Sequence, residues 1–297
     1  MKIKRIVVGI DFSSYAEQAR RRALEMAAAQ SAKVYLVHAF EDSDYQGQQS
    51  WLLRDRNFDE LLKRSRDLAR EQLEKLAKEE PPGVEVRIEL SDMEPYEAIV
   101  DAAKRHKADL VVIGTHGRTG FERLKLARNT ERIVRNSTCS VLVARASKAD
   151  LSAPRRILVP TDFSESAEYA LSIASSMIVG AGRIDVLHCW LTYFYATGYH
   201  GLYEETLSIE PEMAKSIRKQ GEQLLKEHPI AQGEYHFEEK YSAPVSGIQE
   251  ALEHTHYDLV VMGSRGRHGV TRLLLGSTAE ATARHANCSV LIARSAQ

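Results

Sequence analysis

A glycine-rich stretch near the end of the chain carries the residues best suited to bind an anion. It follows an apolar run and is spaced Gly263-x2-Gly266-x9-Gly276-Ser277-Thr278. Glycine lets a backbone come close to an anion because it has no Cβ, and the first amides of a helix carry partial positive charge. Gly263 and Gly266 are expected to shape a turn. The last three residues are expected to start a helix, with hydroxyls that cap it or donate to a phosphate oxygen. The alternative is a long turn that uses glycine only to reach that helix.

Each half of the chain also carries an aspartate soon after a short apolar run. Asp11 lies in Arg-Ile-Val-Val-Gly-Ile-Asp-Phe-Ser, and Asp162 lies 151 positions later in Arg-Ile-Leu-Val-Pro-Thr-Asp-Phe-Ser. Ser13 and Ser164 stand where a helix N-cap is expected, with helices running to about residues 29 and 179. The two aspartates are therefore expected just beyond the carboxyl end of a first strand. Open α/β sheets bind ligands at that edge, and the glycine-rich loop leaves the same edge.

The two halves form a tandem repeat of whole domains. Asp-Leu-Val-Val-Ile-Gly at 109–114 matches Asp-Leu-Val-Val-Met-Gly at 258–263, and Cys-Ser-Val-Leu-Val-Ala-Arg at 139–145 matches Cys-Ser-Val-Leu-Ile-Ala-Arg at 288–294. Repeats of about 145 residues have the size of single domains and are too long for a solenoid. A short polar linker is expected between them. The predicted domains are 1–147 and 154–297.

Within each half, short β-rich apolar runs alternate with longer helical patterns, which is typical of βαβ units and a parallel sheet. In the first half the predicted strands are 3–10, 33–40, 84–90, 110–114 and 140–144. The first, fourth and fifth are apolar nearly throughout, as in strands covered by helices on both faces. We therefore predict an α/β fold of two tandem Rossmann-like domains, each a five-stranded parallel sheet sandwiched by helices.

Composition excludes several classes of protein. The 297 residues carry a formal net charge of −1 and a pI of about 6.8, so no global field recruits nucleic acid. The apolar runs are shorter than a membrane helix needs, and the amino terminus runs into the first strand without room for a signal peptide. Three cysteines are too few for a disulfide framework. The expected location is the cytoplasm, with neither a membrane nor a nucleic acid as partner.

The Asp-Phe-Ser openings and the Cys-Ser-Val-Leu-x-Ala-Arg ends of both halves resemble the universal stress protein family, and the glycine-rich loop resembles its ATP-binding subclass. The resemblance covers nearly the whole chain, twice. It implies a fold related to the adenine nucleotide α-hydrolases, in which the halves pair through their last strands as an internal pseudo-dimer. A homodimer of the tandem chain and an unidentified protein partner are further expectations.

The resemblance also implies roles for residues of the second half. Asp162 is expected beside the adenine and ribose of ATP. Arg265, Arg267 and His268 either add charge near the γ-phosphate or remain solvated. Mg²⁺ or Mn²⁺ is expected with the nucleotide, bound mainly by phosphates and water, because the sequence shows no dedicated metal cage. The residues expected to hold the phosphates are Gly263, Gly266, Gly276 and Ser277, with Thr278 beside them.

The first half departs from this pattern where phosphate is expected. Gly114 and Gly117 keep the turn, but Ala127 and Arg128 replace the Gly-Ser pair. Ala127 adds a Cβ where the backbone is to approach phosphate, and Arg128 puts a cation at a helix start, which the helix dipole disfavours. This equivalent site, which includes Asp11, is therefore predicted to be degenerate. The alternative is that Arg128 and its basic neighbours bind a different anion.

Two further features have competing interpretations. The connection 191–209 is rich in aromatic residues, which form a lid, a contact surface or a cluster packed on its own domain. His38 and His188 are repeat equivalents at the ends of the second strands, near the expected crevice. We predict that both are structural rather than catalytic.

The leading hypothesis for function is an ATP-binding regulatory protein of the stress response, with the nucleotide in the second half and structural support from the first. It rests on one intact and one degraded loop. The alternatives are a slow ATPase or autophosphorylating enzyme, and a nucleotide-independent interaction module. No catalytic residue is identified, because phosphoryl transfer requires a group that positions the nucleophile and none is evident. Any hydrolysis is therefore expected to be weak.

Overall fold

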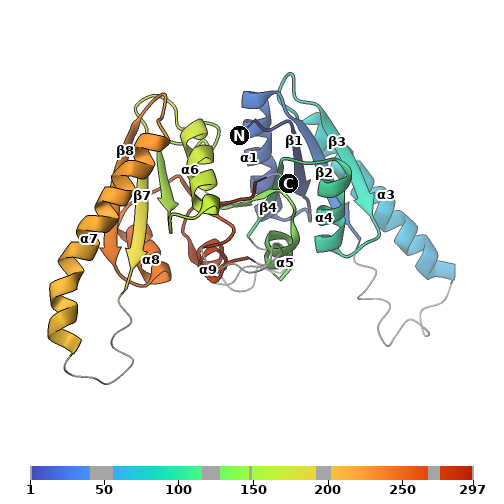
Figure 1. Cartoon of the computed structure of the whole chain (residues 1–297). Helices are drawn as coiled ribbons and strands as arrows, with labels where there is room; N and C mark the ends of the chain where they lie inside the picture. The colour runs from blue at the N-terminus through green and yellow to red at the C-terminus, as the bar shows by residue number, and fades with distance from the viewer. Residues whose placement is uncertain are drawn as a thin grey trace. The chain divides into compact units, whose positions relative to one another are not determined.

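The computed structural model describes residues 2–40, 56–115, 128–146, 149–191, 202–266 and 275–295, without the side chains of 56–59, 61, 62 and 202–210. Two compact units make up this part of the chain, Lys2–Ser152 and Ala153–Ser295. Strands and helices alternate along each unit (Figure 1).

The first unit contains a parallel sheet with the strand order β3-β2-β1-β4-β5. Its strands are β1 Arg5–Gly9, β2 Lys33–Ala39, β3 Val86–Ser91, β4 Leu110–Gly114 and β5 Ser140–Ala144. Its helices are α1 Ser14–Gln30, α3 Arg56–Lys78, α4 Pro95–Arg105 and α5 Arg128–Asn136. The chain moves outward from β1 through β2 to β3 and then returns to the other side of β1. The boundary between β1 and β4 is thus a topological switch point, where ligands bind in open parallel sheets.

The second unit repeats this topology, with the parallel strand order β8-β7-β6-β9-β10. Its strands are β6 Arg156–Pro160, β7 Arg183–Trp190, β8 Glu234–Tyr241, β9 Leu259–Gly263 and β10 Ser289–Ala293. Its helices are α6 Glu165–Met177, α7 Leu202–Glu227, α8 Pro244–His254 and α9 Ser277–His285. The switch point lies between β6 and β9. The prediction of two Rossmann-like domains with parallel sheets is confirmed.

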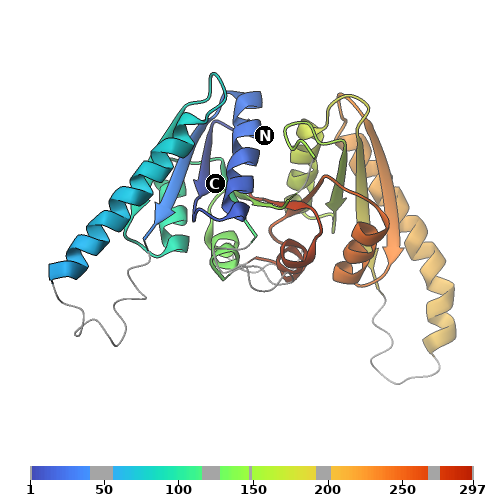
Figure 2. The ribbon, with the colours of Figure 1, turned by 180° about the vertical axis from the view of Figure 1, so that it is seen from behind.

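The central strands of each unit are buried on both faces. In β1, Ile6, Val7 and Val8 are all 0% exposed, so side chains on both faces of the strand contact protein. Helices cover both sides of the sheet: in the first unit Figure 1 presents α4 and α5, and the opposite view in Figure 2 presents α1 and α3. Apolar runs without polar alternation are the expected sequence of such strands. Across the described residues, no helix is both long and apolar enough to cross a membrane.

The aspartate of the repeated Asp-Leu-Val-Val motif is a structural residue. Asp109 Oδ2 accepts hydrogen bonds from the backbone amides of Lys4 at 2.7 Å and Arg5 at 3.0 Å. Asp258 Oδ2 accepts the same pair, from Arg155 at 2.8 Å and Arg156 at 3.0 Å. Each carboxylate therefore satisfies two amides where the first strand of its unit begins. This contact lies at the amino edge of the sheet, opposite the switch point.

The predicted helix starts are confirmed, whereas several predicted boundaries of strands and helices shift by one or two residues. Ser13 accepts a hydrogen bond from the amide of Ala16, and Ser164 accepts one from the amide of Ala167, so both serines are N-caps. The third strand is Val86–Ser91 rather than 84–90, and α6 ends at Met177 rather than near 179. Terminal residues are the least determined part of a periodic pattern because end groups depend on tertiary partners.

Candidate functional site

The switch point of the second unit brings Asp162 and the glycine-rich loop together. Asp162 follows β6, and Gly266 follows β9, the neighbouring strand in the sheet. A Cβ built on Gly266 would lie 2.7 Å from Asp162 Oδ2, closer than Cβ atoms approach other atoms. A Cβ at this position would force the Asp162 side chain to move, so glycine lets the loop lie against the carboxylate as it is oriented here. The predicted meeting of these two residues follows from the parallel sheet, because the carboxyl ends of β6 and β9 share one edge.

The turn after β6 holds the Asp162 carboxylate through local hydrogen bonds. The amide and the hydroxyl of Ser164 donate to Asp162 Oδ1 at 3.1 and 2.6 Å, while Ser164 Oγ caps helix α6. The amide of Phe163 donates to Thr161 Oγ1 at 3.0 Å. Phe163 has a φ of 60°, in the left-handed backbone region that residues other than glycine rarely adopt. This turn orients Asp162 Oδ2 towards Gly266.

The three glycines expected to bind phosphate differ in what they contact. A Cβ on Gly263 would lie 2.6 Å from Ser166 Oγ and 2.8 Å from the backbone of Ser166, so Gly263 is required for close packing of α6 on β9. Gly114 has the same relation to Tyr15 in the first unit, at 2.9 Å. A Cβ on Gly276 would meet nothing among the described residues closer than Ser264 O at 3.6 Å, an ordinary contact. Within the described part of the chain, Gly263 and Gly266 thus have close neighbours that a Cβ would meet, and Gly276 has none.

Helix α9 begins where the sequence predicts it, without a side-chain cap. Gly276 is the N-cap, with φ −66° and ψ 144°, and no side chain of the cap accepts a hydrogen bond. Its amide donates to Ser264 O at 2.9 Å, which closes the loop onto the end of β9. Ser277 is the first helical residue and is exposed, and Thr278 is partly exposed. The first amides of such a helix have no intrahelical acceptor and attract negative charge.

Of the three cationic residues predicted in the loop, only Arg265 lies within the described residues. Arg265 is partly exposed, and among the described residues nothing accepts a hydrogen bond from its buried Nε. Arg267 and His268 lie outside the described residues, as does most of the aromatic connection 191–209. In the described part of the loop, the backbone of Arg265 lies beside the start of α9, since a Cβ on Gly276 would lie 3.7 Å from Arg265 Cα.

The first unit has the same carboxylate turn and a different helix start. Asp11 Oδ1 accepts from the amide of Ser13 at 3.0 Å, and Phe12 has a φ of 61°. Helix α5 begins with Arg128, which is exposed, and Thr130 Oγ1 donates to Gly114 O at 3.0 Å. Gly117 and Ala127 lie outside the described residues. The sequence predicts this arginine at the helix start, where a cation lies at the positive end of the helix dipole and is unfavourable.

Three ionisable side chains of β7 and β8 are buried or hydrogen-bonded within the second unit. His188 Nδ1 lies 2.8 Å from the carbonyl oxygen of Thr161. Burial raises the pKa of the Cys189 thiol to about 11, so the thiol is protonated at neutral pH. Burial also acts to raise the pKa of Glu239, but hydrogen bonds from Trp190 and Arg218 outweigh it and the pKa lies below its usual range. In the described part of the chain, no three His, Cys, Asp or Glu residues cluster as metal ligands would.

Sequence reasoning missed the residues that shape the carboxylate turn. Thr161 and Phe163 are part of this turn, and their contacts are not visible in a hydrophobic pattern. The repeated Asp-Phe-Ser triplet was the available signal, because a fixed triplet at the end of a strand indicates a defined turn. The second switch point brings together the first amides of α9, the loop residue Arg265 and a fixed carboxylate. This combination suits a ligand with both a polyanionic and a hydrogen-bonding polar part.

Fold and site together define a tandem protein of two parallel α/β units, each with a topological switch point between its first and fourth strands. The model of the universal stress protein family matches residues 2–145 and 154–294. The chain therefore belongs to the universal stress protein family.

Similarity to individual universal stress proteins supports this assignment. Universal stress protein MJ0531 of Methanocaldococcus jannaschii is 35% identical over 150 residues, which cover 50% of this chain and 85% of that protein. Universal stress protein Rv2005c of Mycobacterium tuberculosis is 27% identical over 221 residues, 70% of this chain and 69% of the relative. The crystal structure of a universal stress protein from Archaeoglobus fulgidus is similar with a TM-score of 0.59 and 18% identity, covering 98% of this chain and 96% of the other. That structural likeness supports the fold.

Proposed function

We propose that this chain is an ATP-binding regulatory protein of the universal stress response, with the nucleotide held in the crevice of the second unit. The phosphates lie against the loop 263–266 and the start of α9, and Asp162 faces the adenosine part. The first unit supports the second and carries a degenerate form of the site. Nucleotide binding changes the order of the loop and thereby the choice of a protein partner.

The glycine at position 276 is the main support for a nucleotide at this site. Its backbone angles are available to any residue, and a Cβ there would make only ordinary contacts with the described residues. Neither backbone strain nor packing against the described residues therefore calls for glycine at this position. We attribute the glycine to close approach of a ligand to the backbone, because a Cβ would fill the space above the helix amides.

The unequal halves support a single working site. The position equivalent to Gly276 is Ala127, and the position equivalent to Ser277 is Arg128. An exposed serine at the start of α9 can donate to a phosphate oxygen, whereas arginine at the start of α5 faces the positive end of the helix dipole. We therefore expect one nucleotide per chain.

The described residues fit a nucleotide with a divalent cation. Helix amides and Arg265 provide donors for phosphate oxygens, and a bound Mg²⁺ or Mn²⁺ would neutralise the phosphates and keep water ligands. We expect the site to bind ATP rather than to hydrolyse it. Asp162 Oδ1 already accepts a hydrogen bond from Ser164, and His188 Nδ1 already contacts a backbone carbonyl. Phosphoryl transfer needs a group that positions the attacking oxygen, and these two side chains are already held by the turn.

The test is calorimetric titration of nucleotide-stripped protein with ATP and Mg²⁺, for the wild type and for Gly276→Ala. We expect one site per chain in the wild type and at least a tenfold weaker affinity in the variant, equivalent to about 1.4 kcal/mol. The thermal unfolding midpoint should not change, because the nearest described atom lies 3.6 Å from the new Cβ. Ala127→Gly is the matched control in the first unit and should leave the affinity of the site unchanged.

Each other outcome has a defined meaning. Wild-type protein that binds no adenine nucleotide would refute the proposed function. If Gly276→Ala bound ATP as tightly as the wild type, the phosphates would lie elsewhere. Two sites per chain would show that the first unit also binds nucleotide. ATP hydrolysis that Gly276→Ala abolishes would favour the slow ATPase instead.

A further inference from the structure

The two histidines at the ends of the second strands occupy the same position in their units. His38 lies near the end of β2, and His188 lies near the end of β7. In both units the residue after the crevice aspartate is a phenylalanine in the left-handed backbone region, with φ 61° at Phe12 and 60° at Phe163. A residue with a side chain adopts this conformation at a cost and keeps it only where its surroundings compensate.

In the second unit, His188 contacts the chain on both sides of Asp162. Its Nδ1 lies 2.8 Å from the carbonyl oxygen of Thr161, the residue before the aspartate. Its ring centroid lies 4.6 Å from that of Phe163, the residue after it, with the planes inclined by 38°. Since a carbonyl oxygen only accepts hydrogen bonds, Nδ1 must carry the proton in this contact.

Further contacts anchor this arrangement to the sheet. The amide of Thr161 donates to Leu187 O at 2.9 Å, which joins the turn to β7 just before His188. The ring of Phe163 also lies 6.2 Å from the ring of Phe237 on β8. The left-handed turn is thus supported by an adjacent strand through a hydrogen bond and through ring contacts.

We propose that His188 is a positioning residue for the nucleotide site, acting through the turn that presents Asp162. It holds Thr161 by its Nδ1–H and Phe163 by its ring, and so keeps the aspartate between them in the orientation that faces Gly266. This inference rests on the proposed nucleotide site. When the turn occupies its bound conformation only part of the time, the apparent dissociation constant rises by the inverse of that fraction.

The first unit provides the matched comparison. His38 Nδ1 lies 2.7 Å from Ile10 O, and its ring centroid lies 4.7 Å from that of Phe12. The contacts of the histidine with the turn are therefore alike in the two units, although His38 is more buried and also contacts Phe40. The nucleotide is assigned to the second unit alone, so the same substitution should have similar effects on folding and different effects on binding.

The experiment measures ATP affinity and thermal unfolding of the full chain for three variants. His188→Ala should weaken ATP binding by about tenfold, as expected if the turn is correctly formed about a tenth of the time. His38→Ala should lower thermal stability to a similar extent and leave ATP affinity unchanged. His188→Asn should recover part of the affinity, because its amide can donate to Thr161 O in place of Nδ1.

The outcomes separate this inference from the proposed function. If the wild type binds ATP and His188→Ala binds it equally well, or if His38→Ala loses as much affinity, the positioning role is refuted while the nucleotide site stands. If the wild type binds no nucleotide, the proposed function fails first. Should His188→Ala not fold, His188→Asn decides, since wild-type affinity in that variant would show that the ring contact with Phe163 contributes nothing and overturn the two-contact mechanism.

Discussion

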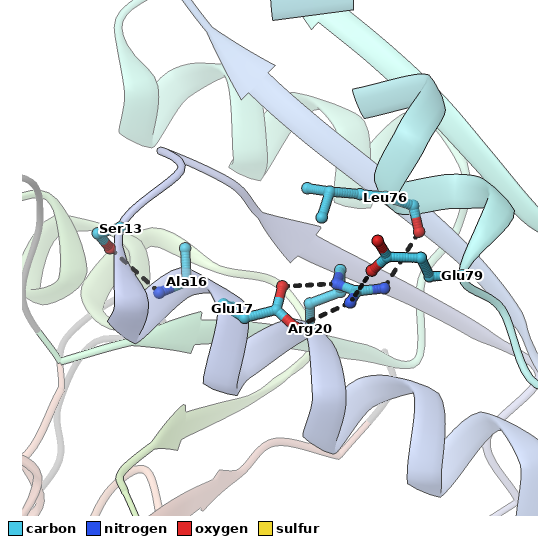
Figure 3. Close-up of polar contacts among 6 residues, drawn as sticks. All are labelled: Ser13, Ala16, Glu17, Arg20, Leu76 and Glu79. Atoms are coloured by element: carbon cyan, nitrogen blue, oxygen red, sulfur yellow. Dashed lines mark hydrogen bonds and ion pairs between the residues drawn. The ribbon is translucent and has the colours of Figure 1, made fainter. Parts of the chain in front are cut away.

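Arg20 is a buried cation whose removal should destabilise the first unit by a predictable amount. Its side chain is 7% exposed on α1 and bonds to three groups (Figure 3). Nε and Nη2 donate to the two oxygens of Glu17, both at 2.8 Å, and Nη2 also donates to Glu79 Oε2 at 3.0 Å. Nη1 donates to Leu76 O at 3.1 Å. Arg20 therefore joins α1 to the end of α3.

The size of the effect follows from these contacts. Glu17 and Glu79 are 47% and 51% exposed, so solvent screens both ion pairs and each contributes at most about 1 kcal/mol. The hydrogen bond to Leu76 O contributes about 1 kcal/mol. Arg20→Ala also removes buried methylene groups, at about 0.8 kcal/mol each. We expect Arg20→Ala to lower the free energy of unfolding by about 3 kcal/mol.

A second substitution separates packing from polar contacts. Leu171 occupies the equivalent position on α6 and is 1% exposed, so the fold accepts leucine there. Arg20→Leu should cost about half as much as Arg20→Ala, because it keeps most of the apolar contact and loses the hydrogen bonds. The Arg20 pKa is raised, with the hydrogen bond from the guanidinium to Glu17 as the largest cause, so Arg20 stays charged throughout the measurement.

The assay is urea unfolding of the full chain followed by circular dichroism. Where two transitions resolve, Arg20→Ala should shift only that of the first unit, and Leu171→Ala should shift the other. If the free energy of unfolding of Arg20→Ala lies within about 0.5 kcal/mol of that of the wild type, Arg20 does not stabilise the first unit as proposed, because ordinary surface substitutions have effects of that size.

The remaining predictions concern packing and pH. Gly263→Ala should destabilise the second unit in thermal unfolding, because its Cβ would lie 2.8 Å from the Ser166 backbone; an unchanged midpoint would contradict this packing role. Burial acts to raise the pKa of Asp185, but hydrogen bonds from Arg183, Arg156 and Tyr257 lower it overall. Ionised Asp185 therefore stabilises the folded protein at pH values above the pKa of the unfolded state, about 3.9. This stabilisation is lost as the pH falls through the lower pKa of Asp185 in the folded protein. Asp185→Asn should be less stable than wild type at neutral pH, with a gap that closes below about pH 4; a gap independent of pH would exclude the linkage.

Much of the fold could be predicted because it depends on local pattern and repetition. The alternation of apolar runs and helical segments predicts a parallel sheet, and the parallel sheet places residues after its first and fourth strands at one edge. Strands 110–114 and 140–144 were predicted to the residue, since buried strands are apolar from end to end. The less buried β3 has no such signal, and its predicted start at 84 differs from the observed Val86.

The sequence by itself determined which residues enter the candidate site. The tandem repeat pairs Asp11 with Asp162, and the comparison of the two loops singles out Gly276, because a repeat within one chain provides its own reference. That Ser13 and Ser164 begin helices also followed from residue type, since an N-cap is a contact between residues three positions apart.

Only the tertiary structure decided what each of these residues contacts. Gly263 and Gly266 look alike in the sequence, yet a Cβ on Gly263 would meet the backbone of α6 and a Cβ on Gly266 would meet the Asp162 carboxylate. The contact of His188 with Thr161 joins residues 27 positions apart, and that of Arg20 with Leu76 joins residues 56 apart. Such contacts depend on the strand order and on which helices share a face of the sheet. Local pattern carries no information about either, because both are set when the whole core packs.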